Sequence, residues 1–354
     1  MKQLLFIKYF VFTLLALLII SCEEDNEITK IKLADGIYIT NEGNWGQSNG
    51  SISYYNYKTD SVYNDIFQNR NGRNLGDVVQ SSAVTTDFIY IVVNGSNKIE
   101  IAYKEDLLEY AVINNLDNPR YIKIKNKTAY LSQWGENGIV KIIDLNSNTV
   151  TGDIIVGTGP EQMEIIGDKL FVANSGAYDR DSTVSVIDLA TNEVTATIKV
   201  GDNPRDFAVD KNNKLWVLCY GYQQYVAPYT ETGSKLVQIN PQTNAIEKTI
   251  EIGTTLHPTS VEAGKGGDYL YIGGGYAFNG LFKVSINDDI FPATPIVDKA
   301  FYAIYVDATR DNIFGFDALN YASRGNMYRF DSDGNQLGLY EVGIIPNGSS
   351  SKKK

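Results

Sequence analysis

The sequence predicts an all-β fold, a β-propeller of seven four-stranded blades, and two repeated features support this prediction. A short apolar run typical of a buried strand occurs seven times along the 354 residues, each time followed by turn residues. A proline that opens another apolar run recurs at intervals close to one repeat or two. Repeats of about 40 to 45 residues with four strands each are typical of propellers.

The clearest repeat begins at Lys169. Three runs of alternating apolar residues each end at Asn, Gly or Asp, and Pro204 then opens a fourth run that continues to Val209. Val, Ile, Thr and Phe at every second position suit a pleated, half-buried strand. The breaks between the runs have the spacing of hairpin turns. We therefore expect this segment to form one four-stranded antiparallel blade.

The number of blades follows from the run that precedes each Asn/Gly loop, which we take as the second strand. The seven runs are Gly36–Thr40, Phe88–Val92, Thr128–Ser132, Leu170–Ala173, Leu215–Leu218, Tyr269–Ile272 and Asn312–Phe316. The prolines that open the fourth runs are Pro119, Pro160, Pro204, Pro258 and Pro346. The wide interval before the last proline contains a copy without proline near Ala300–Phe301.

The two ends of the repeat region predict how the ring closes. The first repeat begins at its second strand, Gly36–Thr40, whereas a spare proline-led segment, Val342–Ser349, follows the seventh. If this C-terminal segment is the innermost strand of the first blade, the ring closes and no open sheet edge remains. We therefore expect a propeller over residues 36–349 and a disordered tail over residues 350–354.

The N-terminal 21 residues predict a lipoprotein signal peptide. Lys2 and Lys8 lead into an apolar run of twelve residues, Tyr9–Ile20, which is too short for a resident membrane span. The following Ser21-Cys22 resembles a bacterial lipobox, in which Cys22 becomes the lipidated first residue. An ordinary signal peptide with a chance cysteine is the alternative.

Residues 22–35 are expected to form an acidic linker between the lipid anchor and the propeller. The stretch Glu23–Glu27 resembles the surface-export signal of Bacteroidetes lipoproteins; the alternative is a solvated linker, and the two are compatible. The expected location is the outer face of the outer membrane, where lipid chains anchor the protein.

Composition excludes several classes of function. The formal net charge of −11 disfavours binding to nucleic acid, which requires clustered Lys and Arg. The sequence contains one histidine, His257, so that His-rich metal or haem sites cannot form. No nucleophile–base motif is present. We therefore expect no catalytic residues, no metal and no cofactor, although catalysis by carboxylates alone stays open.

The candidate binding residues come from two sets of loop segments. In a propeller, the loop between the second and third strands opens on the same face as the segment that enters the innermost strand. Six of the seven loops of the first kind contain Trp, Tyr or Phe. The predicted ligand-binding residues are Trp45, Asn94, Arg120, Trp134, Gln162, Tyr178, Arg205, Tyr222, Tyr225, Tyr229, His257, Tyr276, Phe278 and Tyr321.

Aromatic walls combined with amides and a few charges suit a large, partly flat ligand that carries amides. The alternatives are structural, because Asn and Gly in such loops can serve only the turn, and a single loop tyrosine can serve only packing. The fifth loop, Tyr220–Ser234, lengthens its blade by about ten residues, which favours a functional role.

The segments Leu170–Gly176, Thr183–Leu189 and Thr197–Pro204 resemble the seven-bladed propeller repeat of the YVTN/YncE type. The predicted lipid anchor and aromatic loops further resemble the surface cobalamin-binding lipoproteins of gut Bacteroidetes, the BtuG family. This resemblance implies capture of a corrinoid (vitamin B12), which is passed to a TonB-dependent outer-membrane transporter. In that setting His257 could approach an axial position of cobalt, and packing in a turn is the alternative.

Two other functions stay open, because propellers host many unrelated activities. One is an extracellular propeller enzyme such as a lyase or lactonase. The other is a surface scaffold or adhesin that binds a protein or glycan with the same loops.

Overall fold

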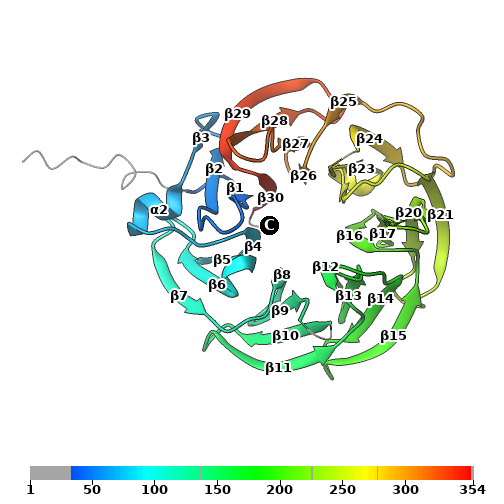
Figure 1. Cartoon of the computed structure of the whole chain (residues 1–354), viewed down its shortest axis with the longest axis horizontal. Coiled ribbons are helices and arrows are strands. Elements are labelled where there is room, and N and C mark those ends of the chain that lie inside the picture. Colours follow the sequence, from blue (N-terminus) through cyan, green and yellow to red (C-terminus); the bar gives the residue numbers. More distant parts are fainter. Residues whose placement is uncertain (1–32, 136–137, 225, 277, 352–354) are drawn as a thin grey trace, which may run out of the picture. The chain divides into compact units, whose positions relative to one another are not determined.

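Seven four-stranded antiparallel sheets form a ring in the computed structural model, which confirms the predicted seven-bladed propeller (Figure 1). The structure describes residues 33–135, 138–224, 226–276 and 278–351. The first 32 residues, which include the predicted signal peptide, Cys22 and most of the linker, lie outside the described part. The innermost strands of neighbouring blades contact one another around the whole ring.

In the first four blades, the strands run in the following order from the innermost outward. Blade 1 contains β30 (Pro346–Ser350), β1 (Gly36–Asn41), β2 (Ser51–Asn56) and β3 (Ser61–Tyr63). Blade 2 contains β4 (Val79–Val84), β5 (Phe88–Val93), β6 (Lys98–Tyr103) and β7 (Glu109–Ile113). Blade 3 contains β8 (Pro119–Lys125), β9 (Thr128–Gln133), β10 (Ile139–Asp144) and β11 (Thr149–Ile155). Blade 4 contains β12 (Pro160–Ile166), β13 (Lys169–Asn174), β14 (Thr183–Asp188) and β15 (Glu193–Lys199).

The remaining three blades follow the same order. Blade 5 contains β16 (Pro204–Val209), β17 (Leu215–Cys219), β20 (Ser234–Ile239) and β21 (Ile246–Gly253). Blade 6 contains β22 (Ser260–Ala263), β23 (Tyr269–Gly273), β24 (Asn279–Ser285) and β25 (Val297–Ala300). Blade 7 contains β26 (Ala303–Asp307), β27 (Asn312–Asp317), β28 (Arg324–Phe330) and β29 (Gln336–Ile344). Short elements in the connections are α2 (Ile66–Asn71), η2 (Asn94–Ser96), η3 (Lys265–Gly267) and the hairpin β18 (Tyr222–Gln223) with β19 (Glu231–Thr232).

The repeat that begins at Lys169 is divided between two blades, which corrects one detail of the prediction. Its first three runs are β13, β14 and β15 of blade 4, whereas the proline-led run is β16, the innermost strand of blade 5. Pro204 pairs with Cys219 of β17 and not with any residue of β15. The sequence repeat is therefore offset by one strand from the structural blade.

The ring is closed by the C-terminal strand, as predicted. β30 pairs antiparallel with β1, so that Ile39 lies opposite Ser349 and Tyr38 opposite Ser350. Both predicted boundaries of this strand were wrong. β29 continues to Ile344 as the outermost strand of blade 7, and Ser350, expected in the tail, is the last residue of β30. Val342 is fully buried within β29, in a cluster that joins blades 7 and 1.

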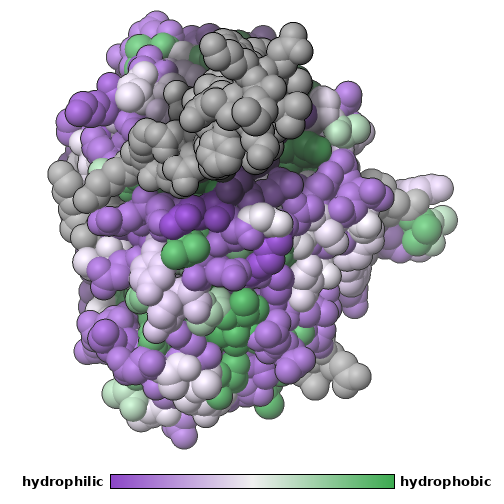
Figure 2. All heavy atoms as spheres, turned by 90° about the vertical axis from the view of Figure 1, so that its left-hand side faces the viewer, coloured by the Kyte–Doolittle hydropathy of each residue, from purple (hydrophilic) through white to green (hydrophobic). Residues whose placement is uncertain are grey.

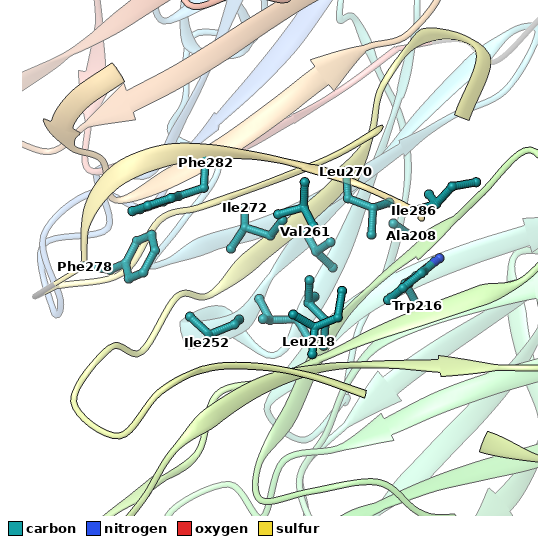
Figure 3. Close-up of a cluster of buried hydrophobic side chains, with 13 residues drawn as sticks. Ala208, Trp216, Leu218, Ile252, Val261, Leu270, Ile272, Phe278, Phe282 and Ile286 are labelled. Atoms are coloured by element: carbon teal, nitrogen blue, oxygen red, sulfur yellow. The ribbon is translucent and has the colours of Figure 1, made fainter. Parts of the chain in front are cut away.

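Hydrophobic clusters lie between neighbouring blades. Figure 3 shows the cluster between blades 5 and 6, where Leu218 and Trp216 of β17 face Val261 and Ile272 of blade 6. The buried Trp216 donates its indole N–H to Asp210 at 2.9 Å, which satisfies its polar atom inside the core. Because each blade packs on both neighbours, loss of one blade exposes two apolar surfaces.

The outermost strands carry the alternating pattern of half-exposed sheets. In β15, for example, Ile198 is buried and its neighbours Thr197 and Lys199 face outward. Figure 2 shows the side of the ring near α2 and β7, where hydrophilic residues predominate and hydrophobic ones form small patches. Among the described residues, no helix has the length and apolar character needed to cross a bilayer.

Candidate ligand-binding face

The loops between second and third strands open on the same face as the starts of the innermost strands. In blade 3, Pro119 at the start of β8 pairs with Gln133 at the end of β9. In blade 4, Pro160 pairs with Asn174 in the same way. The pairing therefore brings the two sets of segments together at one end of the ring. We call this surface the loop face.

The centre of the loop face contains an ion pair between adjacent innermost strands. Arg120 of β8 donates from Nε and Nη2 to the two carboxylate oxygens of Glu161 on β12, both at 3.1 Å. The side chains are only 14% and 3% exposed. Arg120 Nη1 also donates to Gln80 of β4 at 2.6 Å. Burial opposes the charge, but the attraction of Glu161 and Tyr121 keeps the pKa of Arg120 above its ordinary value.

A second polar group connects blades 7, 1 and 2. Glu42 accepts hydrogen bonds at Oε1 from Tyr302 at 3.0 Å and from Asn347 at 3.2 Å. Asn347 also donates to the backbone carbonyl of Gln80, which links this group to the ion pair. Burial raises the pKa of Glu42 despite these two hydrogen bonds and the positive charge of Arg120. Burial and the neighbouring Glu42 carboxylate likewise raise the pKa of Tyr302.

Aromatic rings extend from these polar groups toward solvent. The Arg120 guanidinium lies 4.3 Å from the centre of the Trp134 ring, and Trp134 meets Tyr178 edge to face at 5.2 Å. On the other side, Tyr302 contacts Tyr321 at 5.7 Å, and Tyr321 contacts Tyr276 at 6.1 Å. One series begins at the Arg120 guanidinium and the other at Tyr302, whose hydroxyl donates to Glu42, and both end at a strongly exposed tyrosine.

Four loop aromatics of the loop face are strongly exposed. Trp45 is 74% exposed, Tyr178 94%, Tyr229 79% and Tyr276 85%. We call the two polar groups, Arg120–Glu161–Gln80 and Glu42–Tyr302–Asn347, together the polar centre. The four aromatic residues come from blades 1, 4, 5 and 6, so that aromatic surface is available on several sides of the polar centre. Large exposed aromatic residues in one region of a folded domain are characteristic of interaction sites.

The long fifth loop folds into the hairpin β18–β19. Tyr222 pairs with Thr232, and Gln223 with Glu231. The Thr232 hydroxyl donates to Asp202 at 2.6 Å, and the same carboxylate receives two hydrogen bonds from Arg180. The hairpin is thereby attached to the loops of blade 4 and to the segment that enters blade 5.

His257 lies beside the hairpin and is 7% exposed. Its Nδ1 is 2.6 Å from the carbonyl oxygen of Tyr220, and its Nε2 is 2.8 Å from Glu231 Oε1. The centres of the Tyr220 ring and the imidazole are 5.0 Å apart, and the Arg205 guanidinium lies 5.0 Å from the centre of the same tyrosine ring. Both ring nitrogens of His257 therefore have protein partners.

The structure brings most of the predicted residues to the loop face. Those that are exposed or half-buried there are Trp45, Arg120, Trp134, Gln162, Tyr178, Arg205, Tyr222, Tyr229, Tyr276 and Tyr321. Phe278 is not on the surface, because its ring is 1% exposed in the core between blades 5 and 6. Asn94 is also buried, and its amide donates to the carbonyl of Pro119. Tyr225 lies outside the described residues.

Five residues of the polar centre are absent from the predicted ligand-binding residues. They are Glu42, Gln80, Glu161, Tyr302 and Asn347. Tyr302 directly follows Ala300–Phe301, where the seventh repeat lacks its proline. Alignment of the repeats could therefore have placed Tyr302 at the start of an innermost strand, on the loop face. Gln80 offered no such signal, because the innermost strand of blade 2 begins without a proline.

A separate groove lies between blades 4 and 5 at the edge of the loop face. Its volume is about 630 Å³, and Arg180, Lys199, Asp202, Lys235 and Glu251 contribute to its lining. Two of its cations are paired with its anions, Arg180 with Asp202 and Lys235 with Glu251. The groove is polar and of balanced charge, and it contains none of the strongly exposed aromatic residues.

The loop face is thus suited chemically to binding by stacking and hydrogen bonding. Among the described residues, no group of three or more His, Cys, Asp and Glu is arranged to hold a metal ion. The half-buried Gln162 and Arg205 can present an amide and a guanidinium to a ligand, and the exposed rings can cover a flat apolar surface.

Comparison with known protein families gives a match over most of the propeller. The family model described as "Domain of unknown function (DUF5074)" matches residues 35–289. The chain belongs to the DUF5074 family. The match begins one residue before β1 and ends after blade 6 has formed its third strand. No curated protein matches this DUF5074 chain.

Solved structures with low sequence identity share the fold of this DUF5074 protein. A quinonprotein alcohol dehydrogenase-like protein from Bacteroides thetaiotaomicron superposes with a TM-score of 0.67 at 14% identity, covering 90% of this chain and 78% of that one. A functionally unknown protein from Desulfotomaculum acetoxidans has a TM-score of 0.64 at 11% identity, with coverages of 89% and 98%. Hydrazine synthase from Kuenenia stuttgartiensis has a TM-score of 0.62 at 17% identity, with coverages of 75% and 86%. At these identities the likeness concerns the fold alone.

Proposed function

We propose that this DUF5074 protein is a cell-surface lipoprotein that captures a corrinoid of the vitamin B12 type on its loop face. The observation that supports the proposal is the combination of four strongly exposed aromatic residues with a buried polar centre. A corrin is a large, partly flat ring with peripheral amides and an attached nucleotide. Tyrosine and tryptophan rings provide apolar contact for such a ring, and polar residues between them fix its orientation.

Polar residues of the loop face carry groups that can form hydrogen bonds with the amides and the phosphate of a corrinoid. Arg205 lies over the Tyr220 ring and is half-buried, so that its guanidinium is a candidate donor to the nucleotide phosphate. Gln162 is half-buried and carries an amide that can pair with the amides of the corrin rim. In this proposal Arg120 chiefly holds Trp134 in position, because Glu161 and Gln80 accept three of its five N–H groups and its guanidinium lies 4.3 Å from the centre of the Trp134 ring.

The proposal includes anchoring and delivery. Cys22 would carry the lipid, the acidic residues after it would direct export to the outer face of the outer membrane, and a TonB-dependent transporter would receive the corrinoid. These statements follow from the resemblance of the N-terminal sequence and of the loops. A lipid anchor suits such a task, because it keeps the binding protein beside a transporter in the same membrane.

Calorimetric titration of the purified propeller with cyanocobalamin tests the binding. We expect saturable binding that weakens when Trp134, Tyr178, Tyr222 or Tyr276 is replaced singly by Ala. Truncation of a central aromatic anchor costs about 2 kcal/mol or more, which corresponds to roughly thirtyfold in affinity.

Tyr269→Ala is the matched control for Tyr276→Ala. Tyr269 is the first residue of β23, whereas Tyr276 lies in the loop after the last residue of that strand. Both side chains are exposed. Equal loss of affinity in both variants would contradict the assignment of the loop face. A well-folded protein without corrinoid binding would refute the proposal, and a screen of glycans, proteins and lactone substrates would then distinguish the scaffold from the enzyme.

A further inference from the structure

The single histidine of the chain makes two hydrogen bonds to atoms that can only accept. One partner is the backbone carbonyl oxygen of Tyr220, 2.6 Å from Nδ1, and the other is Glu231 Oε1, 2.8 Å from Nε2. A neutral imidazole has one N–H and one lone pair, whereas the imidazolium has two N–H groups. Only the imidazolium can therefore donate both hydrogen bonds at once.

Glu231 has the environment of an ionised acceptor. Its Oε1 also accepts a hydrogen bond from the Gln223 amide at 2.8 Å. The hydrogen bonds from His257 and Gln223 lower the pKa of Glu231, so that its carboxylate carries no proton to share near neutral pH. Other charged groups near this site are Arg205, which lies over the Tyr220 ring, Asp202, which accepts a hydrogen bond from Thr232, and Arg180, which pairs with Asp202 and lies over the Tyr222 ring.

These two hydrogen bonds connect His257 to both ends of the β18–β19 hairpin. Tyr220 lies just before β18, and Glu231 is the first residue of β19. The hairpin strands have two residues each, so that few backbone hydrogen bonds hold the hairpin by itself. The hairpin carries Tyr222 and Tyr229, two of the aromatic residues on the loop face.

We propose that His257 is a positioning residue whose imidazolium form fixes the hairpin over the loop face, and that loss of its proton loosens the hairpin, which is then held mainly through the Thr232–Asp202 hydrogen bond. At low pH the two hydrogen bonds hold Tyr222 and Tyr229 in place. When the imidazole becomes neutral, either the Tyr220 or the Glu231 bond loses its donor. If the hairpin tyrosines contact the ligand, as the function proposed above requires, the protein binds its ligand more tightly in acidic than in alkaline solution.

A chain without a histidine tag gives a direct test, because its spectrum contains one imidazole. Long-range ¹H–¹⁵N spectra between pH 5 and 9 report which ring nitrogens of His257 carry a proton. Hydrogen exchange of the 220–233 segment, corrected for the intrinsic pH dependence, reports hairpin opening. We expect protection to fall about ten- to hundredfold as the ring loses its proton, as for loss of one charge-assisted hydrogen bond.

Glu231→Gln separates charge from packing. The glutamine amide can donate to a neutral Nε2 while Nδ1–H donates to Tyr220, so that this variant needs no imidazolium. We expect its hairpin to stay protected across the pH range, whereas in His257→Phe protection should stay throughout at the lower level that the wild type shows at high pH. The proposal is overturned if the wild-type ring is neutral while the hairpin is still protected, or if Glu231→Gln opens with the same pH dependence as wild type.

Cyanocobalamin titrations at the two ends of the pH range keep the two proposals apart. If the hairpin responds to pH as expected and no cyanocobalamin binds at any pH, the corrinoid function fails and the role of His257 in the hairpin stands. If cyanocobalamin binds with the same affinity at both ends while the hairpin opens, the statement about capture is refuted.

Discussion

Removal of the Arg120 charge is the sharpest test of the polar centre. In Arg120→Met the aliphatic stem is kept, but the Glu161 carboxylate, 3% exposed, is left without the two hydrogen bonds that it now receives. Removing one partner of a buried ion pair typically costs about 3–5 kcal/mol, because the other charge stays buried without compensation. We expect the free energy of unfolding to fall by an amount in this range.

The second half of the test replaces both partners. Arg120→Met combined with Glu161→Leu removes the uncompensated charge, and apolar replacements of buried pairs are often close to neutral. The double variant should therefore recover most of the loss. Denaturant unfolding, with comparison of midpoints at unchanged slope, measures each change.

Lys125→Met provides the control on the same strand. Lys125 of β8 pairs with Asp168, whose side chain is 89% exposed, and exposed pairs of this kind contribute little to stability. The reasoning is refuted if Arg120→Met and Lys125→Met shift the midpoint equally. It is refuted also if the double variant is less stable than Arg120→Met, since the cost would then not arise from an unpaired Glu161.

Other parts of the molecule give three further predictions. Deletion of Pro346–Ser350 should open blade 1 and cause a large loss of thermal stability with aggregation. Deletion of residues 352–354 serves as the control. An unchanged melting temperature after the first deletion would contradict ring closure. Burial raises the pKa of Asp206 to about 6, above its value in the unfolded chain, so that this group binds a proton more strongly in the folded state. Its contribution to stability should therefore decline as pH rises from about 4 to 6, and Asp206→Asn should flatten that part of the stability curve, measured by denaturation at each pH. Cys22→Ser should release the protein from the membrane fraction, and retention at the wild-type level would rule out the lipid anchor.

The ring could be predicted from sequence because its strands have strong local signals. The second strand of each blade is buried on both faces, so that it appears as a continuous apolar run such as Leu215–Leu218. The boundary between the last two strands, near Val342, could not be predicted. An apolar residue such as Val342 is compatible both with an innermost strand and with an outermost strand that packs on the next blade. The two-residue strands of the β18–β19 hairpin and the six-residue helix α2 are too short to leave a periodic signal.

The candidate site was predictable only in part, because loop composition does not reveal which way a side chain points. Tyr276 and Phe278 are two residues apart in one loop, yet the first is 85% exposed and the second lies in the core. The Glu42–Tyr302–Asn347 group joins residues from both ends of the chain, and no local pattern could have connected them.

The pairing of β1 with β30 has a consequence for the order of folding. Thr40 and Gly348, which face each other in this pair, are 308 residues apart. While the chain is being made, the first blade therefore has three strands and an unpaired inner edge until the last residues arrive. Contacts of such long sequence separation slow folding, and unpaired edges invite association with other chains. A chain halted shortly before its end would contain all its apolar runs and still be unable to form its ring.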